Sequence, residues 1–230
     1  MSKDTFVRPT SIFGFRLFAD LPSTECETIV SAARERRVWR GQTIFYEGDR
    51  ICEVLMPVSG CVKLTQTGIN GDEAILRLIG PGEIVGTIFG CESGQYCSAQ
   101  AIQKTSLLAW DIDLLEWLLE KFPSFRRNVI NAVEETLIEM EHRFWRASTQ
   151  SVASRVSGEL LRLASRWEPK STGERKVVLS QTELAQLTGT AASTVSRLLR
   201  QWQTRGIVAI HRKAITVQNS DALARLADSE

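Results

Sequence analysis

Five cysteines are the most reactive side chains in this sequence of 230 residues. Cys26, Cys52, Cys61, Cys91 and Cys97 include no C-x-x-C pair, and their number is odd. This pattern suits neither a zinc site nor a disulfide framework, so reduced and mostly buried thiols are expected. Cys91 and Cys97 stand apart because they share a glycine-rich stretch, where an exposed thiolate can be oxidised.

That stretch, GTIFGCESGQYCS at residues 86–98, also has the composition of a ligand-binding loop. Its three glycines let the backbone close around a small molecule, but it contains no basic residue to pair with an anion. Elsewhere the sequence has two histidines, His142 and His211, and no nucleophile elbow, P-loop or metal-ligand spacing. Nothing here supports an enzyme.

The charged residues are divided unevenly along the chain. Residues 1–150 hold 16 Lys and Arg against 20 Asp and Glu, whereas residues 151–230 hold 12 against 7. The C-terminal part is therefore the better place for a polyanion to bind. One alternative is a protein that is gated by a nucleotide and makes no contact with DNA, but it would leave this basic segment unexplained.

A helix-turn-helix pattern lies in this basic part, after a helix in ASRVSGELLRLASRW. Ser180 and Glu183 have the spacing of a capping box, which predicts a short helix that ends at Gly189. A second helix is predicted from about Ala191 to Gln203, and a hairpin with a basic tip follows after Gly206. Two unrelated helices with a glycine between them can mimic the first part, but not the wing and the charge.

The middle of the chain, from about Val38 to Trp110, reads as short strands of β-branched and aromatic residues separated by glycine turns, which suggests a sandwich or barrel. After Pro123 the period becomes helical. Apolar residues recur there at intervals of three and four, as on the a/d stripe of a coiled coil. They are Ile130, Val133, Leu137, Met140, Phe144 and Ala147. A parallel dimer seam is the leading interpretation, and a helix packed on its own sandwich is the alternative.

Four motifs in register resemble the Crp/Fnr superfamily of transcription regulators: FYEGD, MPVSGCVKL, PGEIVG and TVSRLL. The resemblance implies an α+β fold with three parts. Residues 1–122 would form N-terminal helices and a cyclic-nucleotide-binding-like β-roll of jelly-roll type, residues 123–150 a dimerisation helix, and residues 151–230 a winged helix-turn-helix. The DNA-binding end is similar to the Fnr-like branch.

Cyclic AMP is disfavoured as the effector. In members that bind it, a glutamate after the loop glycine holds the ribose, an Arg-Ser pair holds the phosphate, and a Thr-Ser pair on the long helix meets the adenine. The corresponding positions of this chain are Gly86, Thr87, Cys97, Ser98, Met140 and Glu141. Losing a charge-assisted contact costs about 1.5–3 kcal/mol.

Other effectors remain open. An iron–sulfur cluster like that of Fnr is not expected here, because Cys26 is the one cysteine among the first fifty residues. Haem needs a ligand, and His142 is predicted to point away from the seam, toward the β-roll. A thiol sensor, an organic ligand, or no ligand are the further possibilities.

The resemblance also assigns the DNA contacts. Ser193, Ser196 and Arg197 would read bases, with Arg197 bonding bidentately to a guanine, and Ser193 stands where most members carry a glutamate. The half-site is therefore expected to be related to TGA, with relaxed or altered base selection next to that core. Phosphate contacts are expected from Thr182, Thr194, Arg200, Arg205, Arg212 and Lys213.

The expected partners are double-stranded DNA, a second copy of the chain and, for an activator, RNA polymerase. No apolar run is long enough to cross a bilayer and no signal core is seen, so a cytoplasmic location is expected.

Overall fold

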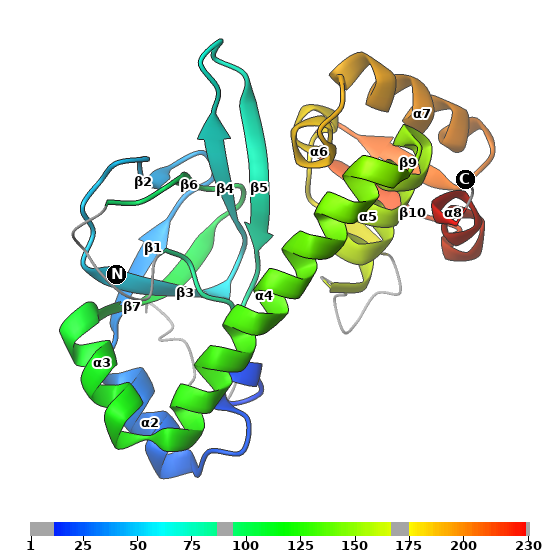
Figure 1. The fold of residues 1–230 in the computed structure, drawn as a ribbon. Coiled ribbons are helices and arrows are strands. Elements are labelled where there is room, and N and C mark those ends of the chain that lie inside the picture. The colour runs from blue at the N-terminus through cyan, green and yellow to red at the C-terminus, as the bar shows by residue number, and fades with distance from the viewer. Residues whose placement is uncertain (1–11, 87–93, 167–174, 229–230) are drawn as a thin grey trace, which may run out of the picture. The chain divides into compact units, whose positions relative to one another are not determined.

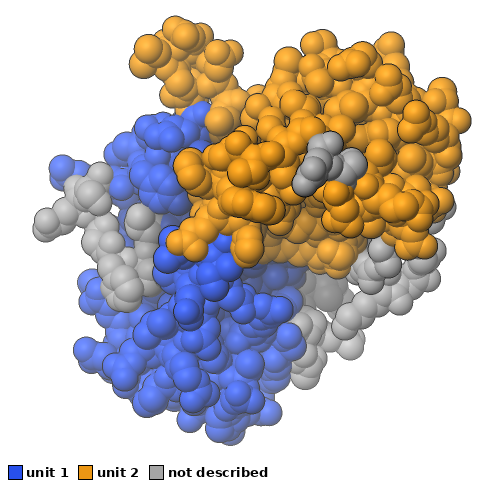
Figure 2. Space-filling view, turned by 45° about the vertical axis from the view of Figure 1, so that its right-hand side comes forward, with its two compact units in different colours: residues 1–66, 76–138 blue, residues 67–75, 139–230 orange. Residues whose placement is uncertain are grey.

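The computed structural model describes residues 12–86, 94–166 and 175–228 (Figure 1). These form two compact units (Figure 2). The first comprises residues 1–66 and 76–138, and the second comprises residues 67–75 and 139–230.

Two antiparallel sheets form the middle of the chain. The three-stranded sheet has the order β1-β7-β3, with bounds Arg34–Val38, Thr105–Asp111 and Glu53–Ser59. The four-stranded sheet has the order β2-β6-β4-β5, with bounds Thr43–Phe45, Ser98–Ala101, Val62–Thr67 and Glu73–Ile79. The predicted β-roll architecture is thus confirmed.

The side chains of β3 point alternately to its two faces, and this alternation determines which of them lie between the sheets. Leu55 points into the space between them and packs in a core with Leu64 and Ala99, while its neighbours Val54 and Met56 point to the other face. All of these side chains are buried because both faces of this sheet are covered. Gly60 is required at its turn, since a Cβ there would lie 2.4 Å from Thr105 Oγ1.

Helices cover the outer face of the three-stranded sheet. They are η1 (Arg16–Phe18), α2 (Ser23–Ser31) and α3 (Ile112–Lys121), together with the first turns of α4. The indole Nε1 of Trp110 donates to the carbonyl of Ile29 at 2.8 Å and so ties β7 to α2. Asn128 ties α4 to the N-terminal segment by donating to the carbonyls of Leu17 and Ala19 at 3.1 and 2.7 Å.

The long helix α4 runs from Pro123 to Thr149, as the sequence predicts. Pro123 is favourable at the first helical position because that N–H has no intrahelical partner. Phe125, Asn128 and Val129 are buried, and no later residue of this helix is.

The second unit contains α5 (Val152–Arg166), α6 (Gln181–Thr188), α7 (Ala192–Thr204) and α8 (Ser220–Ala227). Its sheet has the order β8-β10-β9, with bounds Arg175–Val177, Ala214–Val217 and Val208–His211. The helix-turn-helix and the hairpin agree with the sequence, whereas β8 and α8 were not expected.

Candidate nucleic-acid interface

The capping box that starts α6 is fully formed. The backbone N–H of Glu183 donates to Ser180 Oγ at 3.1 Å, and the N–H of Ser180 donates to Glu183 Oε2 at 2.7 Å. Leu184, Ala185 and Leu187 are buried behind it. This pair fixes where the first helix begins.

Gly189 turns the chain between the two helices. Its φ and ψ of 60° and 44° are left-handed, a conformation that side chains disfavour, and its N–H donates to the carbonyl of Ala185. The next helix, α7, starts three residues later. A tight turn of this kind places the second helix across the first, as helix-turn-helix proteins require.

One side of α7 is buried and the other is free. Val195, Leu198, Leu199 and Trp202 are all buried. Ser193, Arg197 and Arg200 are exposed, and because they are three or four residues apart they share one face. Thr194 and Ser196 are partly buried beside that face, and Thr182 of α6 is exposed. Hydroxyls and a guanidinium thus point outward along the N-terminal half of α7.

The wing carries two more cations. Strands β9 and β10 pair with Ala214 opposite His211, so Arg212 and Lys213 form the connecting turn. His211, Arg212 and Lys213 are exposed. Arg205, at the C-cap of α7, is exposed as well.

A ridge of large apolar side chains runs along α4. Within this single chain Ile130, Val133, Leu137, Met140 and Phe144 are 59%, 49%, 58%, 39% and 76% exposed. Hereafter these five residues are called the α4 ridge. Five such side chains on successive turns of one face are typical of a surface that another protein covers.

The residues expected around an effector lie in both units. In the first, Gly86 has a φ of +96°, Cys97 is buried, and Ser98 Oγ accepts from the N–H of Glu47 at 3.0 Å. Thr87 lies outside the described residues. Met140 and Glu141, in the second unit, are exposed.

Two family models match the chain in the order of these parts. The cyclic nucleotide-binding domain matches residues 35–122, and the Crp-like helix-turn-helix domain matches residues 154–226. The cyclic AMP receptor protein of Thermus thermophilus is 29% identical over 93% of this chain and 97% of its own length. The fumarate and nitrate reduction regulatory protein of Salmonella typhimurium is 28% identical over 84% of this chain and 78% of its own. The chain belongs to the Crp/Fnr superfamily.

A solved Crp/Fnr-like structure has the same fold. The structure of FixK2 from Bradyrhizobium japonicum superposes with a TM-score of 0.73 over 86% of this chain and 98% of its own, at 24% identity. As a Crp/Fnr member the chain is a DNA-binding transcription regulator, and the Salmonella typhimurium relative is named as a regulatory protein. Among the described helices, none is both long and apolar enough to span a bilayer.

The cysteines of this Crp/Fnr protein differ in part from the expectation. Cys26, Cys61 and Cys97 are buried thiols outside any disulfide, but Cys52 is disulfide-bonded, so the expectation of a reduced thiol is wrong there. Burial raises the pKa of the Cys97 thiol to about 11, although a hydrogen bond with Tyr96 acts in the opposite direction. Cys97 is thus a poor thiolate. Cys91 lies outside the described residues.

The two histidines are far apart in the sequence and both exposed. His142 lies on α4, about 160° around the helix axis from the ridge residue Phe144, and His211 ends β9. Within residues 12–86, 94–166 and 175–228, no three His, Cys, Asp or Glu side chains are grouped to hold a metal ion.

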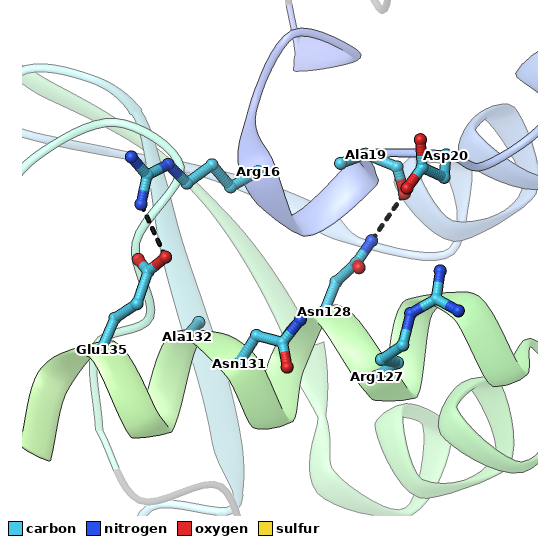
Figure 3. A pocket seen from close by; sticks show the side chains of 8 residues that line it. All are labelled: Arg16, Ala19, Asp20, Arg127, Asn128, Asn131, Ala132 and Glu135. Atoms are coloured by element: carbon cyan, nitrogen blue, oxygen red, sulfur yellow. Dashed lines mark hydrogen bonds and ion pairs between the residues drawn. The ribbon is translucent and has the colours of Figure 1, made fainter.

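A groove of about 460 Å³ lies in the first unit between the N-terminal segment and α4 (Figure 3). Arg16 Nη1 bonds Glu135 Oε1 at 2.6 Å at one end, and Asp20 and Arg127 line the other. The cations and anions are equal in number, so the groove favours neither charge. No sequence pattern indicates this groove, because its two walls are more than a hundred residues apart.

An ionic cluster joins α4 to α5 in the second unit. Arg162 bonds Glu139 Oε1 at 2.9 Å and both oxygens of Glu159 at 2.5 and 3.1 Å, while Arg166 lies 3.5 Å from Glu139 Oε2. Burial by itself would lower the pKa of Arg162, but the bonds and charges of Glu159 and Glu139 outweigh it and the pKa is raised. Sequence reasoning missed this cluster, although Glu159 and Arg162 have the spacing of a helical ion pair.

Proposed function

We propose that the protein is a homodimeric regulator that reads a palindrome through α7 and responds to an effector other than cyclic AMP. The observation that carries the proposal is that α7 buries one side completely and exposes Arg197 on the other. We assign residues 1–122 to the sensing domain, 123–150 to the dimerisation helix and 151–230 to the DNA-binding domain.

Base reading is assigned to Ser193, Ser196 and Arg197. Arg197 is exposed and can present its guanidinium to O6 and N7 of a guanine. Ser193 is exposed too, and its short neutral hydroxyl discriminates less than the glutamate found in most members. A TGA-related half-site with relaxed selection at one position is therefore the expected target.

Backbone contacts are assigned to residues around this reading face. Thr182, Thr194, Arg200, Arg205, Arg212 and Lys213 are the proposed phosphate-binding residues. The charged members of this set are all exposed and lie on α7, at its end or in the wing. Each phosphate contact adds about 0.9 to the steepness with which binding falls with salt.

Dimerisation is assigned to the α4 ridge. The exposure of all five side chains supports a seam with a second copy over the alternative, a helix packed on its own sandwich. A parallel pair of α4 helices would present two copies of α7 about 34 Å apart, one turn of DNA.

The proposed effector is not cyclic AMP. Cys97 stands at the position of the phosphate-binding arginine, and its buried, protonated thiol supplies no positive charge. Gly86, Thr87, Ser98, Met140 and Glu141 complete the proposed effector site. Haem through His142, an organic ligand, or constitutive binding are compatible with these residues, and the visible absorption of the purified protein separates the first from the others. RNA polymerase is the expected partner if the protein activates.

A gel-shift titration tests the reading of DNA. Arg197→Ala is expected to weaken binding to a palindrome of TGA-type half-sites by about 1–3 kcal/mol, which is roughly 5- to 150-fold, and to relax selection at the guanine. Lys213→Ala is the matched control, because it should weaken binding to every sequence equally and lower the salt slope by about 0.9. Equal binding of wild type and Arg197→Ala, seen at low salt only, would contradict the proposal.

A further inference from the structure

Arg143, on α4, bonds two backbone carbonyls that are distant in the sequence. Its Nη2 donates to the carbonyl of Leu187 at 2.8 Å and to the carbonyl of Ile75 at 3.4 Å. Leu187 is in the last turn of α6, and Ile75 is in β5. One guanidinium therefore joins residues of α4, β5 and α6, all three of which belong to the second unit.

The bond to Leu187 caps the first helix of the helix-turn-helix. The last four carbonyls of a helix have no partner within it, and they carry the negative end of the helix dipole. In α6 the N–H groups of Gly189 and Thr190 both donate to Ala185. The carbonyl of Leu187 receives its bond from another helix, and that bond is charge-assisted.

This cap lies directly before the turn that aims α7. Leu187 is two residues before Gly189, and α7 begins at Ala192. A shift of the last turn of α6 is passed to α7 through this short connection. Arg143 therefore fixes the place from which the reading helix starts.

A second attachment lies one helical turn away on the same face of α4. Glu139 is four residues before Arg143 and receives Arg162 and Arg166 of α5. The ridge residues Met140 and Phe144 each follow one position later, about 100° around the helix. One face of α4 thus holds the DNA-binding elements while the adjacent face belongs to the ridge.

We infer that Arg143 is a positioning residue for DNA recognition, which sets the half-site spacing that the dimer accepts by fixing α6, and hence α7, against the ridge-bearing helix. The inference rests on the proposed function, because spacing has a meaning only for a dimer on a palindrome. Arg143 itself is not proposed to touch DNA.

The test compares spacing profiles. A palindrome is first selected by the wild-type protein from randomised duplexes, and its half-sites are then moved apart or together by one and two base pairs. Wild type is expected to lose at least tenfold in affinity for each base pair by which the half-sites are moved from the best spacing. Arg143→Met is expected to lose about tenfold on the best spacing and to bind all the spacings within about threefold of one another. Its affinity for a duplex with a single half-site should stay as in wild type.

Two further variants keep the inference falsifiable. Arg143→Lys retains a cation that can reach one carbonyl, and it should restore most of the spacing preference. Arg143→Ala replaces the methionine variant if that one does not fold. Arg225→Met removes an exposed guanidinium from α8 and should leave the profile unchanged.

The possible failures are distinguishable. If Arg143→Met loses the same factor of affinity at every spacing, or loses no affinity at any spacing, Arg143 does not set the spacing preference. Either result would overturn the inference while leaving the proposed function intact. A wild-type protein that binds the palindrome no better than a single half-site would overturn both.

Discussion

The burial of Cys97 limits which effectors the protein can bind or sense. The residue is buried in the core between the two sheets, with Val85 and Ala99 in the same cluster. A neutral thiol in such a place has no positive charge to pair with an anion. It also reacts slowly with oxidants, because the exposed thiolate is the reactive form. The thiol sensor considered from the sequence therefore loses one of its two cysteines.

Alkylation measures this directly. Burial raises the pKa of Cys97 to about 11, so the thiol stays protonated at pH 8, where the thiolate needed for alkylation is scarce. We expect iodoacetamide to label Cys97 at least tenfold more slowly in the folded protein than after unfolding in urea. Digestion and mass spectrometry locate the label. Labelling of Cys97 at equal rates in both states would contradict the burial that the structure shows.

Single residues were predictable where their role depends on near neighbours in the sequence. The place of Arg197 on the outer face follows from the spacing of Val195, Leu198 and Leu199 around it. Arg143 could not be found in this way, since its acceptors are backbone carbonyls 44 and 68 residues away and leave no mark in the sequence.

Among the elements, α6 depends most on its ends. It has eight residues, which is too short for a helix to be stable by itself in water. Ser180 and Glu183 stabilise its start, and Gly189 with Arg143 its end. Both ends must hold for the turn to α7 to keep its geometry.

Removing the N-cap should loosen α6. Ser180→Ala deletes the acceptor of the Glu183 N–H, and such changes cost about 1 kcal/mol, within a range of roughly 0.5–2. Hydrogen exchange in peptides that cover α6 should then be about fivefold faster. Gln181→Ala, one residue later, lacks a capping role and should not change the exchange. Unchanged protection in Ser180→Ala would show that packing alone holds the helix.

The elements that the sequence did not predict have non-local causes. Strand β8 has three residues, and it is a strand only because Val177 pairs with Ile215 of β10. Helix α8 is different, because it has a local signal at its start: Asn219 Oδ1 accepts from the N–H of Ala222 as an N-cap does. The roll, the long helix and the helix-turn-helix were predictable because their apolar periods and turn glycines are regular.

At the scale of the whole molecule, the proposed dimer seam along the α4 ridge would make two reading helices act together. Its five side chains are far more exposed than the core residues Phe125 and Val129 at the start of the same helix. Linking two binding modules raises affinity by about 10²–10⁴ without a new contact. Most of the affinity for a palindrome should therefore depend on residues that never approach DNA.

A charge in the ridge should separate the two chains. Leu137→Lys is expected to give a particle of 25.7 kDa in sedimentation equilibrium, where wild type gives twice that mass. Affinity for the palindrome should fall about hundredfold. Asn131→Lys puts the same charge outside the ridge on the same helix and should leave the protein dimeric. A wild-type chain that sediments as a monomer would refute the dimer.

The composition of the ridge also bears on partner choice. No member of it is polar, whereas a buried asparagine or lysine at such a position is what fixes alignment and excludes foreign helices in many coiled coils. In the proposed dimer, the charged side chains that flank the seam must therefore determine whether α4 pairs with an identical chain or with a related one. A cell that makes two regulators of this kind would form mixed pairs unless those flanks repel, and a mixed pair would read an asymmetric operator that neither parent recognises.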